Sequence, residues 1–254
     1  PTRCQACQGE YLEFSGLGTE RVELEVRQRC PEARVSRMDR DTMAHRGAAD
    51  EVLTRFGRGE IDILVGTQMV AKGHDFPNVT LVGVVSADVG LGVADFRAGE
   101  RTFQLLTQVA GRAGRGSRPG ETIVQTINPN HYSIRHACLQ NYEAFYREEI
   151  QFRQAMRYPP TLGLINLIVR GRSEAAAMGD GFRLVEALQR LGRTEWILGP
   201  ALAPLSRLKG QHRVQVLAKG DHRIRLGEIV EAALEELPRI RRRISVDVDP
   251  VFVS

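Results

Sequence analysis

The sequence predicts two α/β parts: a doubly wound domain with a parallel sheet, and a smaller α+β domain after it. Short runs rich in valine and isoleucine alternate with helical segments up to about residue 128, the pattern of a parallel sheet covered by helices. The prolines Pro159-Pro160 then end a helical stretch. Beyond them the patterns follow the order β-α-β-β-α-β, which is typical of a split βαβ unit.

The first domain takes its helices from amphipathic runs and its strands from apolar ones. Thr19 is a plausible N-cap for the first helix, because a hydroxyl there can accept a bond from the first turn. The predicted helices are "GTERVELEVRQRC" (18–30), "RGAADEVLTRFGRG" (46–59) and "ERTFQLLTQVAGR" (100–112). The predicted strands are "ARVSRM" (33–38), "IDILVG" (61–66), "VTLVGVVSAD" (79–88) and "ETIVQTI" (121–127).

The remainder of the chain begins with one long amphipathic helix over residues 131–156, which we expect to connect the two domains. The elements predicted after it are a strand (164–171), a helix (174–191), a strand near Trp196, a strand (212–220), a helix (223–237) and a strand (244–250). We therefore place the first domain at 17–130, the connecting helix at 131–160 and the C-terminal domain at 161–254.

Composition is that of an ordinary globular protein with enough apolar material for a sizeable core, at 42% hydrophobic and 26% charged residues over 254. No run of about 18 uncharged apolar residues suggests a membrane span. The net charge of +4 is weak support for an anionic partner. The grouping of the basic residues along the chain is stronger support for one. The groups are Arg112, Arg115 and Arg118; Arg207, Lys209 and Arg213; and Arg239, Arg241, Arg242 and Arg243.

Four cysteines are too few for a disulfide framework. Cys4 and Cys7 form a C-x-x-C pair, whereas Cys30 and Cys138 stand alone in predicted helices, where we expect small buried residues. A reducing cytosol, and hence a cytoplasmic protein, is the expectation.

The stretch "TQVAGRAGR" (107–115) places two glycines and two arginines at a predicted helix end. On a continuous helix, Gln108, Arg112 and Arg115 share one face, opposite Phe103 and Leu106. Planar guanidinium groups suit a polyphosphate, and the glycines would let a bulky ligand approach. The alternative is a solvated basic helix end favoured by the helix dipole.

Q-x-x-G-R-x-G-R resembles motif VI of superfamily-two helicases, and residues 66–85 resemble motif V. The longer string "ADFRAGERTFQLLTQVAGRAGRG" (94–116) and the closing "DVDP" (247–250) are similar to the primosomal replication-restart DNA helicases, and the resemblance covers essentially the whole chain. It implies a second RecA-like helicase lobe followed by a DNA-binding domain. The implied activity is that of an ATP-dependent 3′–5′ DNA helicase that recognises stalled forks and restarts replication by primosome assembly.

The resemblance also implies roles for individual residues. Arg112 and Arg115 would reach the nucleotide phosphates, with Arg115 as the main arginine finger, and Gln108 would lie near the attacking water. Gly73, Asp75 and Thr67 would couple the nucleotide state to DNA, although Gly73 and Asp75 also suit a helix cap and a turn.

DNA contacts are implied at two places. Thr19 and Glu20 match the motif IV region, where a hydroxyl and amides at a helix N-terminus can bind phosphate. In the C-terminal domain, we expect a loop leading into a strand to clamp a DNA backbone, and a solvated basic loop is the alternative. The loop residues are Arg207, Lys209, His212 and Arg213.

Metal, cofactor and partners follow from the same resemblance. Residues 1–16 match the end of a zinc-binding cysteine-rich insertion, so Cys4 and Cys7 would supply half of a zinc site whose other ligands lie upstream. ATP with magnesium is the expected cofactor of the full-length protein. The expected partners are forked and single-stranded DNA, single-stranded DNA-binding protein and primosome proteins, with no membrane.

No G-x-x-x-x-G-K-[ST] loop and no acidic Walker B box occur in the 254 residues. The resemblance assigns these motifs to a first lobe, so we expect that this chain alone does not hydrolyse ATP. Two alternatives remain open: another superfamily-two helicase that acts in recombination or on RNA, and a helicase-derived scaffold that binds DNA without hydrolysis.

Overall fold

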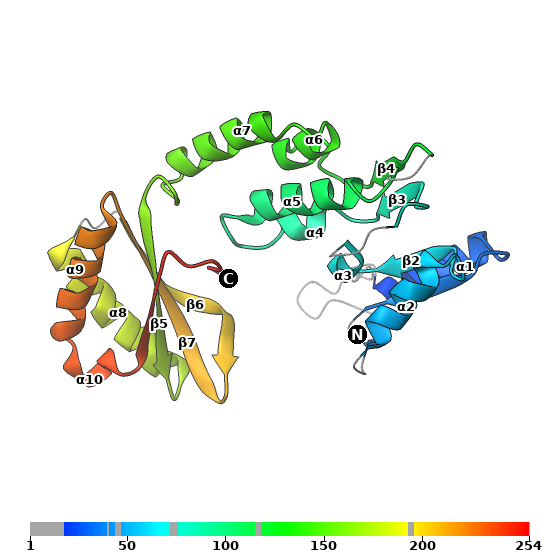
Figure 1. The fold of residues 1–254 in the computed structure, drawn as a ribbon. Helices are drawn as coiled ribbons and strands as arrows, with labels where there is room; N and C mark the ends of the chain where they lie inside the picture. Colours follow the sequence, from blue (N-terminus) through cyan, green and yellow to red (C-terminus); the bar gives the residue numbers. More distant parts are fainter. Residues whose placement is uncertain are drawn as a thin grey trace, which may run out of the picture. The chain divides into compact units, whose positions relative to one another are not determined.

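The computed structural model describes residues 18–39, 41–43, 47–71, 76–114, 118–192 and 196–253 (Figure 1). The chain divides into two compact units. The first comprises the residues up to Gly92 together with Gly99–Phe145, and the second comprises Val93–Ala98 together with Tyr146 onward. In these ranges no helix is long and apolar enough to cross a membrane.

The first unit is built from short parallel strands and helices. Strand β1 pairs with β2 through Val35↔Ile63, and β3 pairs with β4 through Leu81↔Glu121, both in parallel. This confirms the predicted α/β class with parallel strands. The elements, in chain order, are α1 (Thr19–Arg29), β1 (Val35–Met38), α2 (Ala48–Gly57), β2 (Ile63–Gly66), α3 (Gln68–Ala71), β3 (Leu81–Val84), α4 (Asp88–Leu91), α5 (Ala98–Ala110), β4 (Glu121–Val124) and α6 (Tyr132–Cys138).

Helix α5 is anchored by its apolar side, as its sequence pattern predicts. Phe103 and Leu106 are buried in one cluster with Ile134 of α6 and with Phe145. The rings of Phe103 and Phe145 stack with their centroids 4.0 Å apart. Burying an aromatic or leucine side chain contributes about 1.5–3 kcal/mol, so this cluster holds α5 firmly in the unit.

The prediction of a single connecting helix is wrong, because the chain forms α6 and then α7 (Tyr142–Ala155). Gln140 adopts a left-handed φ of 49°, which an α-helix cannot continue through. Asn141 then caps the new helix, since its Oδ1 accepts a hydrogen bond of 3.0 Å from the backbone N–H of Ala144.

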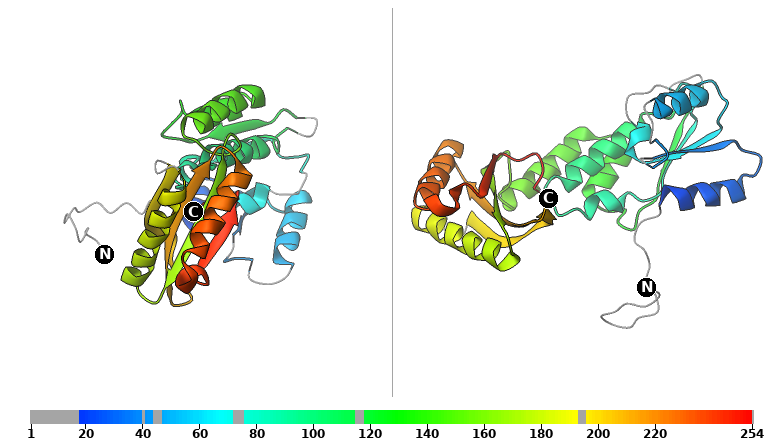
Figure 2. Two further views of the ribbon diagram at one scale, coloured as in Figure 1. Left: turned by 90° about the vertical axis from the view of Figure 1, so that its left-hand side faces the viewer. Right: turned by 90° about the horizontal axis from the view of Figure 1, so that it is seen from below.

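The second unit has the predicted β-α-β-β-α-β order, with a short extra helix before the last strand. Its antiparallel sheet runs β6-β7-β5-β8, the ferredoxin-like arrangement, with α8 and α9 side by side on one face (Figure 2). The elements are β5 (Gly163–Gly171), α8 (Glu174–Leu191), β6 (Ile197–Leu208), β7 (Gln211–Gly220), α9 (Arg223–Glu235), α10 (Pro238–Arg241) and β8 (Ile244–Val248).

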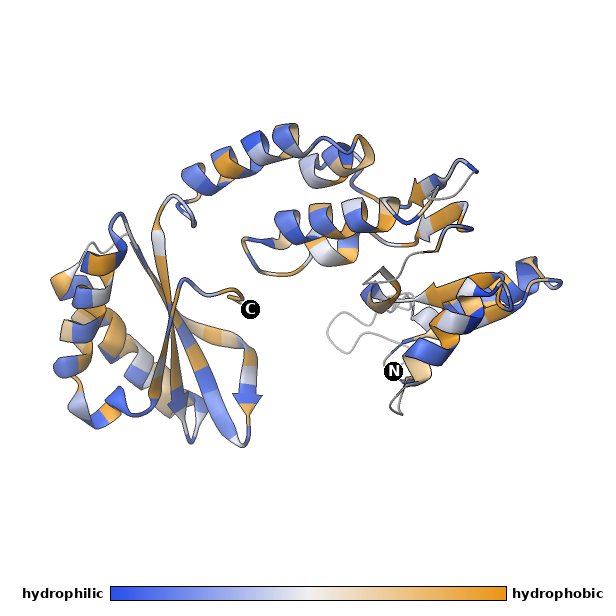
Figure 3. Cartoon of the chain, viewed as in Figure 1, coloured by the Kyte–Doolittle hydropathy of each residue, from blue (hydrophilic) through white to orange (hydrophobic). Residues whose placement is uncertain are grey.

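Side-chain alternation gives this sheet one helix-covered face. Ile165, Leu167 and Val169 of β5 are buried with Val214 and Val216 of β7 against α8 and α9. The helices alternate between hydrophobic and hydrophilic residues along their length (Figure 3), as amphipathic helices on a core must. The even-numbered residues of β5 therefore lie on the opposite face.

Part of that opposite face is covered by two short segments of the same unit. Phe96 stacks on Tyr158 with ring centroids 4.8 Å apart and is buried with Leu164 and Val253. The backbone N–H of Val253 donates to Asp95 at 3.3 Å, and the Gln215 amide donates to the Val253 carbonyl at 2.7 Å. Residues 93–98, which lead into α5 and include its first residue, therefore belong to the C-terminal unit, an arrangement that sequence patterning does not indicate.

Candidate functional site

The glycine-arginine stretch is a turn rather than a continuous helix. Helix α5 ends at Ala110, and Gly114 has a left-handed φ of 75° while its N–H donates to the Val79 carbonyl at 3.0 Å. A methyl group on Gly114 would lie 2.6 Å from the backbone nitrogen of Gly120. The prediction of one helical face through residue 115 is therefore wrong, and the turn itself requires glycine at position 114.

The predicted catalytic residues follow the same helix end. Gln108 is exposed in the last turn of α5, and Arg112 is half-buried in the turn that follows. Arg115 lies outside the described residues. The buried Phe103 and Leu106 fix the helix from which this amide and this guanidinium project. An amide and a guanidinium group on a rigid helix end fit the oxygens of a phosphate chain.

The predicted Thr67 lies at the carboxyl end of β2, next to the carboxyl end of β1. Met38 pairs with Gly66, so Asp39 and Thr67 follow neighbouring strands at one sheet edge. The Thr67 carbonyl accepts the Val70 N–H at 3.1 Å as α3 begins. A methyl group on Gly66 would lie 2.5 Å from the Met38 carbonyl oxygen, which explains glycine there. Gly73 and Asp75 lie outside the described residues.

Thr19 does not cap α1, contrary to the prediction. The N-cap is Gly18, without a side-chain cap, and the Thr19 hydroxyl donates to Asp39 at 2.5 Å. The one O–H donor of Thr19 is thereby engaged by the Asp39 carboxylate. Thr19 as a ligand of DNA phosphate stays a prediction, and in this structure binding would require that hydrogen bond to break.

Asp39 is the centre of this edge. Its carboxylate accepts hydrogen bonds from the Thr19 hydroxyl and from the backbone and hydroxyl of Thr42, and it lies 3.3 Å from Arg37. The Thr19 bond first, then the Thr42 bonds and the Arg37 charge, lower the pKa of Asp39 to about 2. Glu20 is exposed and lies 3.9 Å from Arg37, so carboxylates dominate this helix start.

The predicted DNA-binding loop is a β-hairpin. Arg207 pairs with His212 and Leu208 with Gln211, which leaves Lys209 and Gly210 as a two-residue turn. Both turn residues have positive φ values of 50° and 78°, the requirement of a type I′ turn. The loop prediction is wrong because this tight turn lets β6 and β7 extend to the tip.

The hairpin distributes its cations over two faces. His212 shares the parity of Val214 and thus the helix-covered side, with Arg207 opposite it. Arg213 lies on the other face, where its guanidinium donates to the Leu205 carbonyl at 3.2 Å. Lys209 is exposed at the tip. The four residues are therefore neighbours, but they do not form a single clamp.

Sequence reasoning missed Arg170, which lies directly opposite Arg213 in the β5–β7 ladder. Like charges in that position repel, so an anion beside them would be stabilising. The available signal was the "RGR" sequence at the end of a predicted strand.

No metal centre is found among the residues with a described placement, since no three His, Cys, Asp or Glu side chains come together there. Cys4 and Cys7 lie outside those residues, so the zinc half-site stays a prediction. Cys30 and Cys138 are exposed, which corrects the expectation that they are buried. Cys30 is the C-cap of α1, a helix without buried residues, and Cys138 is the last residue of α6.

Two family models match separate parts of the chain. The helicase conserved C-terminal domain matches residues 17–117, and the primosomal protein N C-terminal domain matches residues 154–251. Relatives align over the whole chain: "Replication restart protein PriA" of Bacillus subtilis at 44% identity, of Synechocystis at 40% and of Haemophilus influenzae at 38%. The chain spans 31–35% of the length of these three relatives.

Proposed function

Because the chain belongs with the C-terminal portion of the PriA replication restart proteins, we propose that it supplies one wall of an ATP-driven DNA motor and a DNA-binding unit. The motor is a 3′–5′ DNA helicase that recognises stalled replication forks and restarts replication through primosome assembly. The observation that carries this proposal is one chain that combines an α/β unit, with Gln108 and Arg112 at the end of α5, and a ferredoxin-like unit that carries a basic hairpin.

In this proposal α5 positions the residues that meet the nucleotide. ATP with magnesium supplies the phosphate chain to be cleaved, and its binding loop lies outside this chain, since the 254 residues include no P-loop. Arg112 and Arg115 hold positive charge at the phosphate oxygens, and Gln108 orients water through its amide. Gly73, Asp75 and Thr67 link that site to bound DNA. Gly114, with its left-handed φ of 75°, lies in the turn that follows α5.

The C-terminal unit holds DNA through the hairpin cations Arg207, Lys209, His212 and Arg213, with Thr19 and Glu20 as a further contact in the first unit. We assign Cys4 and Cys7 to a zinc site completed by ligands outside the chain. The partners are forked and single-stranded DNA, single-stranded DNA-binding protein and primosome proteins, and the location is cytoplasmic.

The decisive test measures DNA-stimulated ATP hydrolysis in the full-length protein. Arg112→Ala and Arg115→Ala should each lower the turnover number by about 10³-fold or more, with little change in DNA affinity, because arginine fingers act on charge in the transition state. Arg118→Ala is the matched control, since this exposed arginine follows the motif. Undiminished turnover in both variants would remove the motor assignment. A preference for RNA duplexes over forks would instead favour another superfamily-two helicase.

A further inference from the structure

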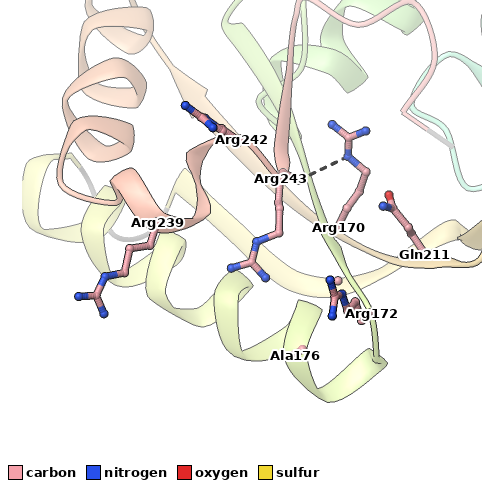
Figure 4. A pocket seen from close by; sticks show the side chains of 8 residues that line it. Arg170, Arg172, Ala176, Gln211, Arg239, Arg242 and Arg243 are labelled. Carbon is pink, nitrogen blue, oxygen red and sulfur yellow. Dashed lines mark hydrogen bonds between the residues drawn. The ribbon is translucent and has the colours of Figure 1, made fainter.

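An arginine-lined cavity of about 530 Å³ lies at one end of the sheet of the C-terminal unit (Figure 4). Four segments form it: the end of β5 with the following Arg172, the first turn of α8, the start of β7, and α10 with the residues that follow it. Its polar lining consists of Arg170, Arg172, Arg239, Arg242, Arg243 and Gln211. No acidic side chain lines it.

The packing of Gly171 explains why two of these arginines flank the cavity. A methyl group on Gly171 would lie 2.7 Å from the backbone nitrogen of Ala177, so the end of β5 packs directly on the first turn of α8. Arg170 and Arg172, on either side of that glycine, are thereby held near the N-terminus of an 18-residue helix. The helix dipole adds positive potential there.

Most of this positive charge is not neutralised by neighbouring carboxylates. Arg243 forms an ion pair with Asp180 at 2.9 Å, and Arg170 donates to the Ser245 hydroxyl at 3.0 Å. Within the described ranges, Arg172, Arg239 and Arg242 form no ion pair. Like charges around one cavity repel by about 1 kcal/mol per close pair even in water, and a bound anion relieves that repulsion.

The lining also indicates the chemistry of the ligand. Guanidinium forks bind phosphate oxygens in a bidentate manner, whereas no aromatic ring lines the cavity to stack on a base. The cavity adjoins the hairpin, because Gly171 pairs with His212 and Arg170 with Arg213, and Gln211 belongs to both. A strand that lies along the hairpin would therefore pass its phosphates over the cavity.

We propose that this arginine cavity binds consecutive backbone phosphates of a DNA strand whose neighbouring nucleotides contact the β6–β7 hairpin. The proposal rests on the DNA-binding role given above to the C-terminal unit, and it adds a site whose contacts are to phosphate alone. Such a site increases affinity without selecting a base sequence.

The test uses the 254-residue chain and measures its Kd for a single-stranded oligonucleotide by fluorescence anisotropy at several NaCl concentrations. The double variant Arg239→Gln/Arg242→Gln should raise the Kd about tenfold and reduce the slope of log K against log salt by about 1.4, since each phosphate contact to a single strand contributes about 0.7. The matched control is Arg190→Gln/Arg241→Gln, which removes the same charge from arginines paired with Glu236 and Glu231 on the same unit. It should leave the slope unchanged.

A hairpin variant, Arg207→Gln/Lys209→Gln, separates this proposal from the one on which it rests. If the hairpin variant loses affinity while the cavity variant behaves like its control, DNA binding by the unit stands and the cavity proposal fails. If the unaltered chain binds no DNA, both fail. A last outcome would also overturn the proposal. Pyrophosphate could raise the unfolding temperature of the unaltered chain but not of the cavity variant, while both bind DNA with equal affinity. The cavity would then be a site for a free anion.

Discussion

The paired arginines of the first unit and the cavity arginines of the second lie in different electrostatic settings. In the first, Arg37 lies between Glu23 at 3.5 Å and Asp39 at 3.3 Å, and Arg34 forms a close pair with Asp62 at 2.7 Å. In the second, five arginines line a cavity that has no lining carboxylate. Arginines with carboxylate partners hold strands and helices together, whereas Arg172, Arg239 and Arg242, which form no ion pair among the described residues, are available to an anion. A basic composition alone does not distinguish these two uses.

The largest expected change in stability comes from a test of whether an arginine–carboxylate pair also stabilises the fold of the C-terminal unit. Glu149 and Arg153 form a buried pair at 2.6 Å with exposed side-chain fractions of 7% and 9%. Glu149→Ala should lower the free energy of unfolding by about 3 kcal/mol, because it leaves a buried guanidinium without its carboxylate. Urea unfolding followed by circular dichroism measures this, with exposed Glu235→Ala as the control. A loss of unfolding free energy below about 1 kcal/mol would show that the buried Arg153 does not depend on a carboxylate partner for stability.

An intermediate effect tests the carboxylate centre of the first unit. The pKa of Asp39 is lowered to about 2, so ionised Asp39 stabilises the fold above the unfolded pKa of about 4, and this stability is lost as the pH falls toward 2. Asp39→Asn should remove about 1–2 kcal/mol at pH 7 and flatten the dependence of unfolding free energy on pH between 5 and 2. Chemical unfolding across that range provides the measurement. An equally steep dependence in the variant would assign the acid sensitivity to other carboxylates.

The smallest effect is expected from exposed pairs. Arg190 lies 2.6 Å from Glu236, with side-chain exposures of 61% and 42%. Arg190→Gln should change the free energy of unfolding by less than about 0.5 kcal/mol, since solvent screens such pairs. Thermal unfolding at low and high salt checks this. A larger, salt-sensitive loss would mean that exposed pairs also hold the C-terminal unit together.

The local sequence pattern was sufficient to predict the structure where each residue's environment is set by its neighbours in sequence. The order of elements in the C-terminal unit follows from side-chain alternation in β5 and β7 and from helix periodicity between them. The buried side of α5, with Phe103 and Leu106, was predicted in the same way.

Long-range contacts account for what the pattern missed. The end of α5 depends on Gly120 approaching Gly114, and the role of Thr19 depends on Asp39, 20 residues away. The arginine cavity combines positions about 70 residues apart in sequence, from Arg170 to Arg243, which no local pattern connects. The restart of the helix at Asn141 had a local signal, a good capping residue, that the longer periodicity obscured.

The placement of residues 93–98 has a consequence for how the chain can be divided. The polypeptide passes between the units at Gly92–Val93, at Ala98–Gly99 and at Phe145–Tyr146. Cleavage at any one of these joins leaves the other two peptide connections intact, so limited proteolysis must sever all three before the fragments can part. The first residue of helix α5 thus belongs to the unit that carries the hairpin, and the rest of the helix belongs to the other unit.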